Sequence, residues 1–165
     1  MRWLGPALLS VFVAALTYVA ALWATPHVIM AKAMEKLGAG RINTMQHQGL
    51  PNAESRFVVR PSPDLAYSIC VFDLSKGPVA IDAFVPPQRY WSLSVFDANT
   101  DNIFSVNDRA VSERYALTLS KDGAGESLAV PGGKGIALIR ILVTDPHDLG
   151  RIDSLRRRST CGVRK

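Results

Sequence analysis

The chain has 165 residues, a mass of 18.0 kDa and a formal net charge of +5 at pH 7. This length accommodates one ordinary globular domain with appendages, and we expect no second full domain, because domains cluster at about 100–150 residues. Hydrophobic residues make up 48% of the sequence, which is high for a soluble domain, and they are concentrated at the N-terminus.

The first predicted element is a transmembrane anchor over residues 1–24. No residue from position 3 to position 24 is charged, and a helix needs about 20 apolar residues to cross the hydrocarbon core. Trp3 and Trp23 are spaced to lie at the two interfaces. The alternative is a cleavable secretory signal, with small residues around Ala20 as its cleavage site. We favour the uncleaved anchor, because the apolar run exceeds the usual signal length of about 7–15 residues.

A juxtamembrane helix and a linker are predicted over residues 25–55. Thr25 is a candidate N-cap, Pro26 suits the first helical position, and Gly38 follows the last turn. The helix carries one apolar stripe, which we interpret as a packing or bilayer surface rather than a partner-binding face: Met30, Ala33, Met34 and Leu37. The linker contains one short expected strand around Asn43–Gln46.

Residues 56–145 predict a β-sandwich. Short alternating or β-branched runs are separated by turns rich in Gly, Pro, Asn and Asp. No helical periodicity separates these runs, so a mostly antiparallel sandwich is favoured over parallel βαβ units. The expected strands are Arg56–Arg60, Leu65–Asp73, Val79–Val85, Tyr90–Asp97, Asn102–Val106, Arg114–Ser120 and Ile136–Thr144.

A basic C-terminal helix and tail are predicted over residues 146–165. Asp145 precedes Pro146, and the apolar residues at 149, 152 and 155 share a face that folds back on the sandwich. The arginines at 156–158 would then point outward. Without aromatic interleaving or a nucleic-acid-binding fold, these arginines indicate solvation or contact with anionic lipid, and no nucleic-acid partner is expected.

A series of polar motifs lies between residues 60 and 102, among the apolar strand residues. The motifs are Arg60-Pro61-Ser62-Pro63-Asp64, Tyr67-Ser68, Phe72-Asp73-Leu74-Ser75 with Gly77-Pro78, Arg89-Tyr90-Trp91 and Thr100-Asp101-Asn102. In order and spacing, the series resembles the bacterial domain-of-unknown-function family 1254 over roughly residues 55–145. One departure is Leu65-Ala66, where many members have Asp-Thr. The resemblance implies an immunoglobulin-like β-sandwich, in agreement with the strand pattern.

The resemblance also implies a partner and a location. Longer members of the family continue into a second β domain, family 1214, which is absent here, so we expect a separate family 1214-like protein as partner. The expected location is the bacterial inner membrane, with a single span and a periplasmic β domain. The positive-inside rule points the other way, because Lys32, Lys36 and Arg41 outnumber Arg2 as flanking charges.

The polar motifs supply candidate ligand-binding residues. An arginine near an aspartate and a tyrosine can bind a carboxylate or phosphate bidentately, with the phenol as a further hydrogen-bonding group. The alternative is structural, because aspartates at strand ends cap turns and pair with arginines. The candidates are Arg60, Asp64, Tyr67, Asp73, Arg89, Tyr90, Asp101 and Asn102.

Catalytic and metal motifs are missing from the sequence. The histidines at 27, 47 and 147 are widely separated, and there is no G-x-S-x-G elbow, no CxxC and no HxxxH. We therefore expect no metal and no cofactor, and we favour a non-enzymatic binding or assembly module of the cell envelope. The alternative is an envelope enzyme, possibly a hydrolase, with one pocket formed by Asp64, Tyr67, Asp73, Arg89 and Asp101.

The two cysteines leave two alternatives open. A bridge between Cys70 and Cys161 would link the tail to the sandwich in an oxidising compartment. A buried, inert Cys70 with a free Cys161 is the default interpretation.

Overall fold

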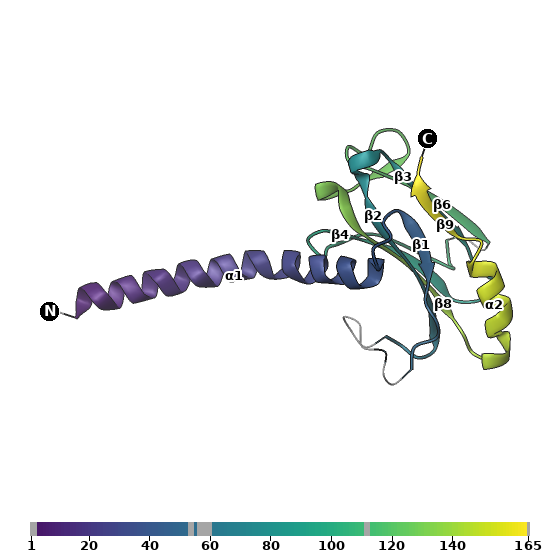
Figure 1. The fold of residues 1–165 in the computed structure, drawn as a ribbon, viewed down its shortest axis with the longest axis horizontal. Coiled ribbons are helices and arrows are strands. Elements are labelled where there is room, and N and C mark those ends of the chain that lie inside the picture. The colour runs from purple at the N-terminus through teal and green to yellow at the C-terminus, as the bar shows by residue number, and fades with distance from the viewer. Residues whose placement is uncertain (1–2, 53–54, 56–60, 111–112, 165) are drawn as a thin grey trace.

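The computed structural model describes residues 3–52, 55, 61–110 and 113–164 of the chain. A long N-terminal helix projects from a β domain, and a short helix lies on the far side of that domain (Figure 1). The helices are α1 (Leu4–Gly38) and α2 (Leu149–Arg156), with 3-10 turns η1 (Leu74–Lys76), η2 (Pro131–Gly133) and η3 (Pro146–Asp148). The described strands are β1 (Thr44–His47), β2 (Leu65–Asp73), β3 (Val79–Phe84), β4 (Trp91–Asp97), β5 (Asn102–Asn107), β6 (Arg114–Ser120), β7 (Ser127–Ala129), β8 (Lys134–Leu142) and β9 (Thr160–Val163).

These strands form two sheets, named sheet A and sheet B. Sheet A has the order β1-β2-β8-β4-β5, and sheet B has the order β7-β6-β3-β9. The described pairings are antiparallel apart from that of β6 with β7, which is parallel. The prediction of a mainly β domain behind an apolar N-terminal helix is confirmed. Its immunoglobulin-like character stays a prediction.

Three strands at the edges of the two sheets differ from the sequence-based expectation. β1 lies one residue from the strand expected at Asn43–Gln46, whereas β7 and β9 were not expected at all. Segments of three or four residues are too short to show an alternating pattern, and β9 forms only because β3 offers it an edge. The strand expected at Arg56–Arg60 lies outside the described residues.

Apolar side chains fill the space between the two sheets. Successive side chains of a strand point to opposite faces, so Cys70 and Phe72 of β2 face the interior, whereas Ile69 and Val71 face outward. The largest side chains of the interior are almost wholly inaccessible to solvent: Trp91, Phe72, Ile81, Leu93, Leu119, Ile139 and Ile141.

Helix α1 continues through the boundary that the sequence suggested at Thr25. Thr25 is not an N-cap, because its Oγ1 donates a hydrogen bond to the carbonyl oxygen of Ala21, at 2.6 Å, and Pro26 lies inside the helix. An interior proline removes one backbone hydrogen bond, yet apolar residues continue on both sides of it. The helix is long and apolar enough to cross a membrane, with a mean hydropathy of 2.1 over an 18-residue window that is entirely exposed.

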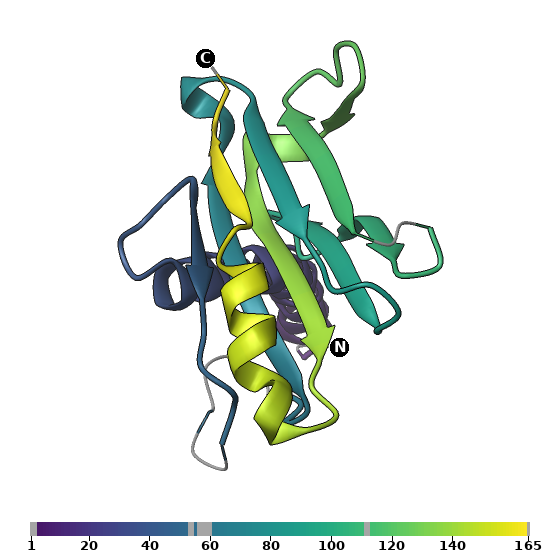
Figure 2. The ribbon, with the colours of Figure 1, turned by 90° about the vertical axis from the view of Figure 1, so that its right-hand side faces the viewer.

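The last turns of α1 pack on the outer face of sheet A. Figure 2 views most of α1 nearly end on, behind the two sheets. The outer face of sheet A is therefore the face that is turned toward the N-terminal part of the helix. The apolar stripe of the helix is therefore a packing surface of the domain. The contact buries Met30, Ala33, Ile69, Val71 and Ile136, with Met34, Leu37, Phe96 and Leu138 at its margin.

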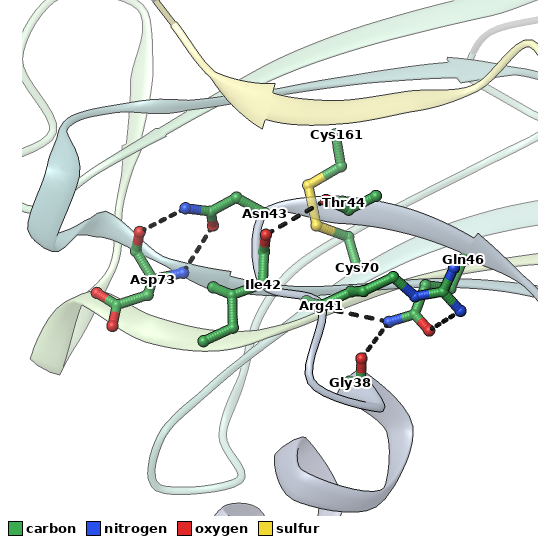
Figure 3. Close-up of a disulfide and its surroundings, with 9 residues drawn as sticks. All are labelled: Gly38, Arg41, Ile42, Asn43, Thr44, Gln46, Cys70, Asp73 and Cys161. Atoms are coloured by element: carbon green, nitrogen blue, oxygen red, sulfur yellow. Dashed lines mark hydrogen bonds between the residues drawn. A yellow bond between two sulfur atoms is a disulfide. The ribbon is translucent and has the colours of Figure 1, made fainter.

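A short polar turn joins the end of α1 to β1 (Figure 3). Ala39 ends the helix in the left-handed conformation, with φ of 43°, and the buried Gln46 donates from Nε2 to the carbonyl oxygen of Gly38, at 2.8 Å. The Asn43 side chain bonds both backbone groups of Asp73, accepting from its N–H at 2.8 Å and donating to its carbonyl oxygen at 3.0 Å. The helix end is thus hydrogen-bonded directly into sheet A.

A disulfide joins the two sheets. β9 pairs with β3, with Cys161 opposite Ile81, and Cys161 forms a bond to Cys70 of β2 (Figure 3). The default interpretation of a free Cys161 is therefore wrong. The sequence could not show this, because the position of Cys161 depends on the unexpected strand β9.

We expect Cys161→Ala to lower the free energy of unfolding by about 2–5 kcal/mol, because the bond closes a loop with a sequence separation of 91 residues. Urea unfolding of the full chain in mild detergent measures this loss. Reductant should lower the wild type to the level of the variant and leave the variant unchanged. A wild type that is insensitive to reductant would contradict the bridge.

Candidate functional site

The sequence-predicted site residues separate into two groups at opposite ends of sheet A. Strand β2 begins with Leu65 opposite Leu142 and ends with Asp73 opposite Lys134. This span of nine residues is about 27 Å long at roughly 3.4 Å per residue. Arg60 lies outside the described residues.

Asp73, Asp101 and Asn102 lie at the Lys134 end of sheet A, where aspartate carboxylates accept hydrogen bonds within turns. Asp73 accepts from Ser75 N at 2.8 Å and pairs with Lys134 Nζ at 3.2 Å. Burial raises the pKa of Asp73, but the hydrogen bonds from Ser75 and the charge of Lys134 outweigh it, so the pKa lies below its ordinary value. Asp101 donates its backbone N–H to the Asp97 carboxylate, at 3.0 Å. The exposed Asn102 opens β5.

Asp64, Tyr67, Arg89 and Tyr90 lie toward the Leu142 end. The exposed Asp64 accepts from Val143 N through its backbone oxygen, at 2.8 Å. The Tyr67 hydroxyl accepts from Ser62 N at 2.9 Å, which holds the lead into β2. The five residues proposed for one enzyme pocket therefore do not converge, because Asp73 and Asp101 lie at the other end of the sheet.

Arg89 ties the β3–β4 loop to the start of α2. Its Nη2 donates to Asp148 Oδ2 at 2.6 Å, and its Nη1 donates to Thr144 Oγ1 at 3.1 Å. The side chain of Arg89 is only 16% exposed, so a ligand would have to displace existing bonds to reach it. Tyr90 is 42% exposed, and only its backbone contributes to the sheet, accepting from Leu142 N at 3.0 Å.

A groove of about 320 Å³ lies beside this ion pair, between the β3–β4 loop and α2. Pro86 and Pro87 form one wall, and the exposed side of α2 forms the other. The chain folds this way because Ile152 anchors α2 in the core, which turns the flanking positions of the helix toward the loop. The wall opposite the prolines consists of Arg151, Ile152, Ser154 and Leu155 of α2, together with Arg158, two residues after the helix ends.

The rim of the groove is positively charged. Arg151 is 76% exposed and only approaches Asp148, at 3.8 Å. The Arg158 guanidinium lies 4.4 Å from the centroid of the Phe84 ring, and it pairs with no carboxylate among the described residues. Guanidinium groups bind carboxylates and phosphates in a fixed planar geometry. The groove can therefore accept an anionic group next to an apolar one.

Arg156 lies behind the groove and is buried, not outward-facing as expected. Only 2% of its side chain is exposed. Its Nε donates to Asp153 Oδ1 at 2.7 Å, its Nη1 to Tyr67 O at 2.7 Å and its Nη2 to Gln48 O at 2.6 Å. The expectation failed because Arg156 follows Ile152 by four residues and shares its inward face. This arginine holds α2 against β2 and against the segment after β1.

A serine and a histidine come into contact where the sequence predicted none. Strand β1 places His47 opposite Ser68, with 2.9 Å between His47 Nδ1 and Ser68 Oγ. Burial, followed by the charges of Arg156 and Arg157, lowers the pKa of His47 against an opposing effect of Asp153. Ser68 is only 1% exposed, so no substrate reaches its hydroxyl and the pair is structural. The pairing of β1 with β2 was the missing signal.

The described residues contain no group of three or more histidine, cysteine or acidic residues that could hold a metal ion.

Comparisons with known proteins give a family and a fold. The family model described as "Protein of unknown function (DUF1254)" matches residues 42–162. No curated protein matches. The VPA0106 protein from Vibrio parahaemolyticus is similar in structure, with a TM-score of 0.62 and 14% identity, over 84% of this chain and 35% of that chain. An uncharacterized protein from Burkholderia cenocepacia gives a TM-score of 0.50 and 13% identity, over 85% and 40%. The chain thus spans at most about two-fifths of these solved proteins.

Arg156→Met should destabilise the fold by about 2–4 kcal/mol, because the carbonyl oxygens of Tyr67 and Gln48 lose this donor and Asp153 keeps only Arg157. Arg157→Met is the matched control, since Arg157 pairs with the same Asp153 but is 61% exposed, and it should cost less than about 1 kcal/mol. Urea unfolding measures both. Equal losses would show that Arg156 acts only through Asp153.

Stability should fall as the pH drops below 6.5, the ordinary pKa of histidine. The lowered pKa of His47 means that the unfolded chain binds this proton more readily than the folded chain. His47→Gln should remove this slope, whereas the exposed His147→Gln should keep it. The lowered pKa values of Asp73, Asp82 and Asp153 act only below about 3.8. Thermal unfolding between pH 4.5 and 7.5 checks this, and an unchanged slope in His47→Gln would refute it.

Proposed function

This chain belongs to the DUF1254 family of proteins of unknown function, and from that premise we propose that it is a membrane-anchored cell-envelope module that binds a partner protein in the groove beside α2. The occupant is a segment of the partner that carries a carboxylate next to an apolar side chain. The activity is binding and assembly, not catalysis.

The observation that carries the proposal is the charge of the groove. Arg151 and Arg158 stand at its rim, the former exposed and the latter free of any carboxylate partner within the described ranges. Pro86, Pro87 and Leu155 supply apolar walls between them. A volume of about 320 Å³ is at the small end of ligand sites, which suits a few side chains of a docked segment.

The position of the groove supports a protein partner. Figure 1 shows α2 on the side of the β domain opposite to α1. With α1 in the bilayer, the groove faces away from the membrane. A second protein can therefore reach it without contact with lipid.

A family 1214-like protein is the proposed partner. The chain matches only 35% and 40% of the two solved proteins, so more than half of each of those proteins lies outside the matched part. We propose that a separate chain supplies the corresponding module here.

The proposed location is the bacterial inner membrane, with the β domain on the periplasmic side. The disulfide between Cys70 and Cys161 supports this side, because such bonds persist in the periplasm and are rare in the cytosol. The disulfide thus favours the opposite orientation to the one that the positive charges flanking the span predict.

The enzymatic alternative has less support. A hydrolase that used Asp64, Tyr67, Asp73, Arg89 and Asp101 would need these side chains around one concave site. The register of β2 with β8 holds them at two ends of sheet A, and Arg89 is already bonded to Asp148 and Thr144.

The test measures binding of the full chain in mild detergent to the family 1214-like protein of the same bacterium. The double variant Arg151→Glu with Arg158→Glu should weaken binding at least tenfold, because two charge-assisted contacts are lost, each worth about 1.5–3 kcal/mol. Arg109→Glu with Lys121→Glu is the control for net charge, since both residues are exposed and lie outside the groove. This pair changes the net charge by the same amount, and it should change affinity less than twofold.

Two results would contradict the proposal. One is a wild-type chain that does not bind this protein. The other is a groove double variant that binds as tightly as the control pair Arg109→Glu with Lys121→Glu. An unchanged thermal unfolding midpoint in the double variant ensures that lost binding reflects the groove and not the fold.

A further inference from the structure

A second polar feature lies on the outer face of sheet A, away from the groove. Arg140 of β8 lies across β4, where its Nε donates to Ser92 Oγ at 3.0 Å and its Nη2 donates to Ser94 Oγ at 3.2 Å. The two serines are almost fully buried, at 2% and 1% exposure. The serines thus fix the plane of the guanidinium.

Arg140 has no carboxylate partner among the residues that the structure describes. Its Nη1 makes none of the described hydrogen bonds, and the two described hydrogen bonds of its side chain go to hydroxyls. A guanidinium held by two neutral hydroxyls keeps its full charge and its remaining donors for a ligand. The geometry suits an anion that accepts two parallel N–H bonds, such as a phosphate.

The contact with α1 places this arginine near the bilayer. Arg140 lies two residues along β8 from Leu138, at the margin of the surface on which α1 packs, and so about 7 Å from it. The views in Figures 1 and 2 agree that α1 leaves from this face of sheet A. The site formed by Arg140, Ser92 and Ser94 therefore faces the membrane that α1 crosses.

The distance along α1 places sheet A just outside the headgroup layer. Met30 is the first residue of α1 buried on the sheet, and it follows the interfacial Trp23 by seven residues, or about 10 Å at roughly 1.5 Å per residue. Headgroups extend about 5–7 Å beyond the hydrocarbon on each side of a bilayer. The part of sheet A nearest to the bilayer consequently begins about 3–5 Å beyond this layer, and its outer face is turned toward the lipid phosphates.

We propose that Arg140, oriented by Ser92 and Ser94, binds the phosphate of an anionic phospholipid in the bilayer that α1 crosses. A basic group close to an anionic lipid surface is attracted to it. The site is independent of the groove, which faces away from the membrane.

The test uses the full chain in a non-ionic detergent, titrated with phosphatidylglycerol and followed by native mass spectrometry. Arg140→Gln should lower the affinity for this lipid five- to tenfold. Arg158→Gln is the matched control, because it removes an unpaired guanidinium from the opposite side of the domain, and its effect should stay below twofold. Arg140→Lys keeps the charge but loses the two-pronged geometry, and it should lower the affinity two- to threefold.

Three results would overturn the proposal. The first is an Arg140→Gln variant that retains wild-type affinity. The second is an equal loss in Arg158→Gln, which would indicate attraction by net charge alone. The third is competition by inorganic phosphate at the concentration at which the lipid binds, which would identify a soluble anion as the ligand. If Arg140→Gln does not fold, the graded loss in Arg140→Lys and the phosphate competition decide the matter.

Discussion

The contact between the end of α1 and the outer face of sheet A sets the geometry of the whole molecule. Met30 and Ala33 pack on Ile69 and Val71, and Gln46 bonds the last carbonyl of the helix. Apolar burial alone would allow the helix to slide, because the hydrophobic effect has no direction. The polar cap removes that freedom, so this one contact determines which face of the β domain lies toward α1 and which side lies away from it.

A second set of bonds attaches the C-terminal segment, which contains α2 and β9, to the rest of the β domain. The disulfide holds β9 over β2, and Arg156 reaches across to the backbone at Tyr67 and Gln48. Each of these bonds fixes a short segment, β9 or α2, that contributes few side chains to the core. Helix α2 is thereby held still enough for the arginines on its outer side to keep a fixed spacing.

The sequence predicted those elements whose signal is local. Leu65–Asp73 and Arg114–Ser120 agree with β2 and β6 because alternation over seven to nine residues is a strong pattern. β9, the disulfide and the His47–Ser68 pair depend on partners distant in sequence, and the burial of Arg156 depends on carbonyl groups that only the fold supplies. The groove was missed for the same reason, because its walls come from a loop and a helix more than sixty residues apart.

The unbroken helix has a mechanical consequence. Membrane helices tilt to match bilayer thickness, by about 20° on average, and a flexible linker would absorb such a tilt. Here Pro26 does not interrupt α1, and the turn from Ala39 to Asn43 is bonded into the sheet. With α1 in a bilayer, a change in lipid thickness would therefore rotate the entire β domain, and the direction in which the groove points would change with it.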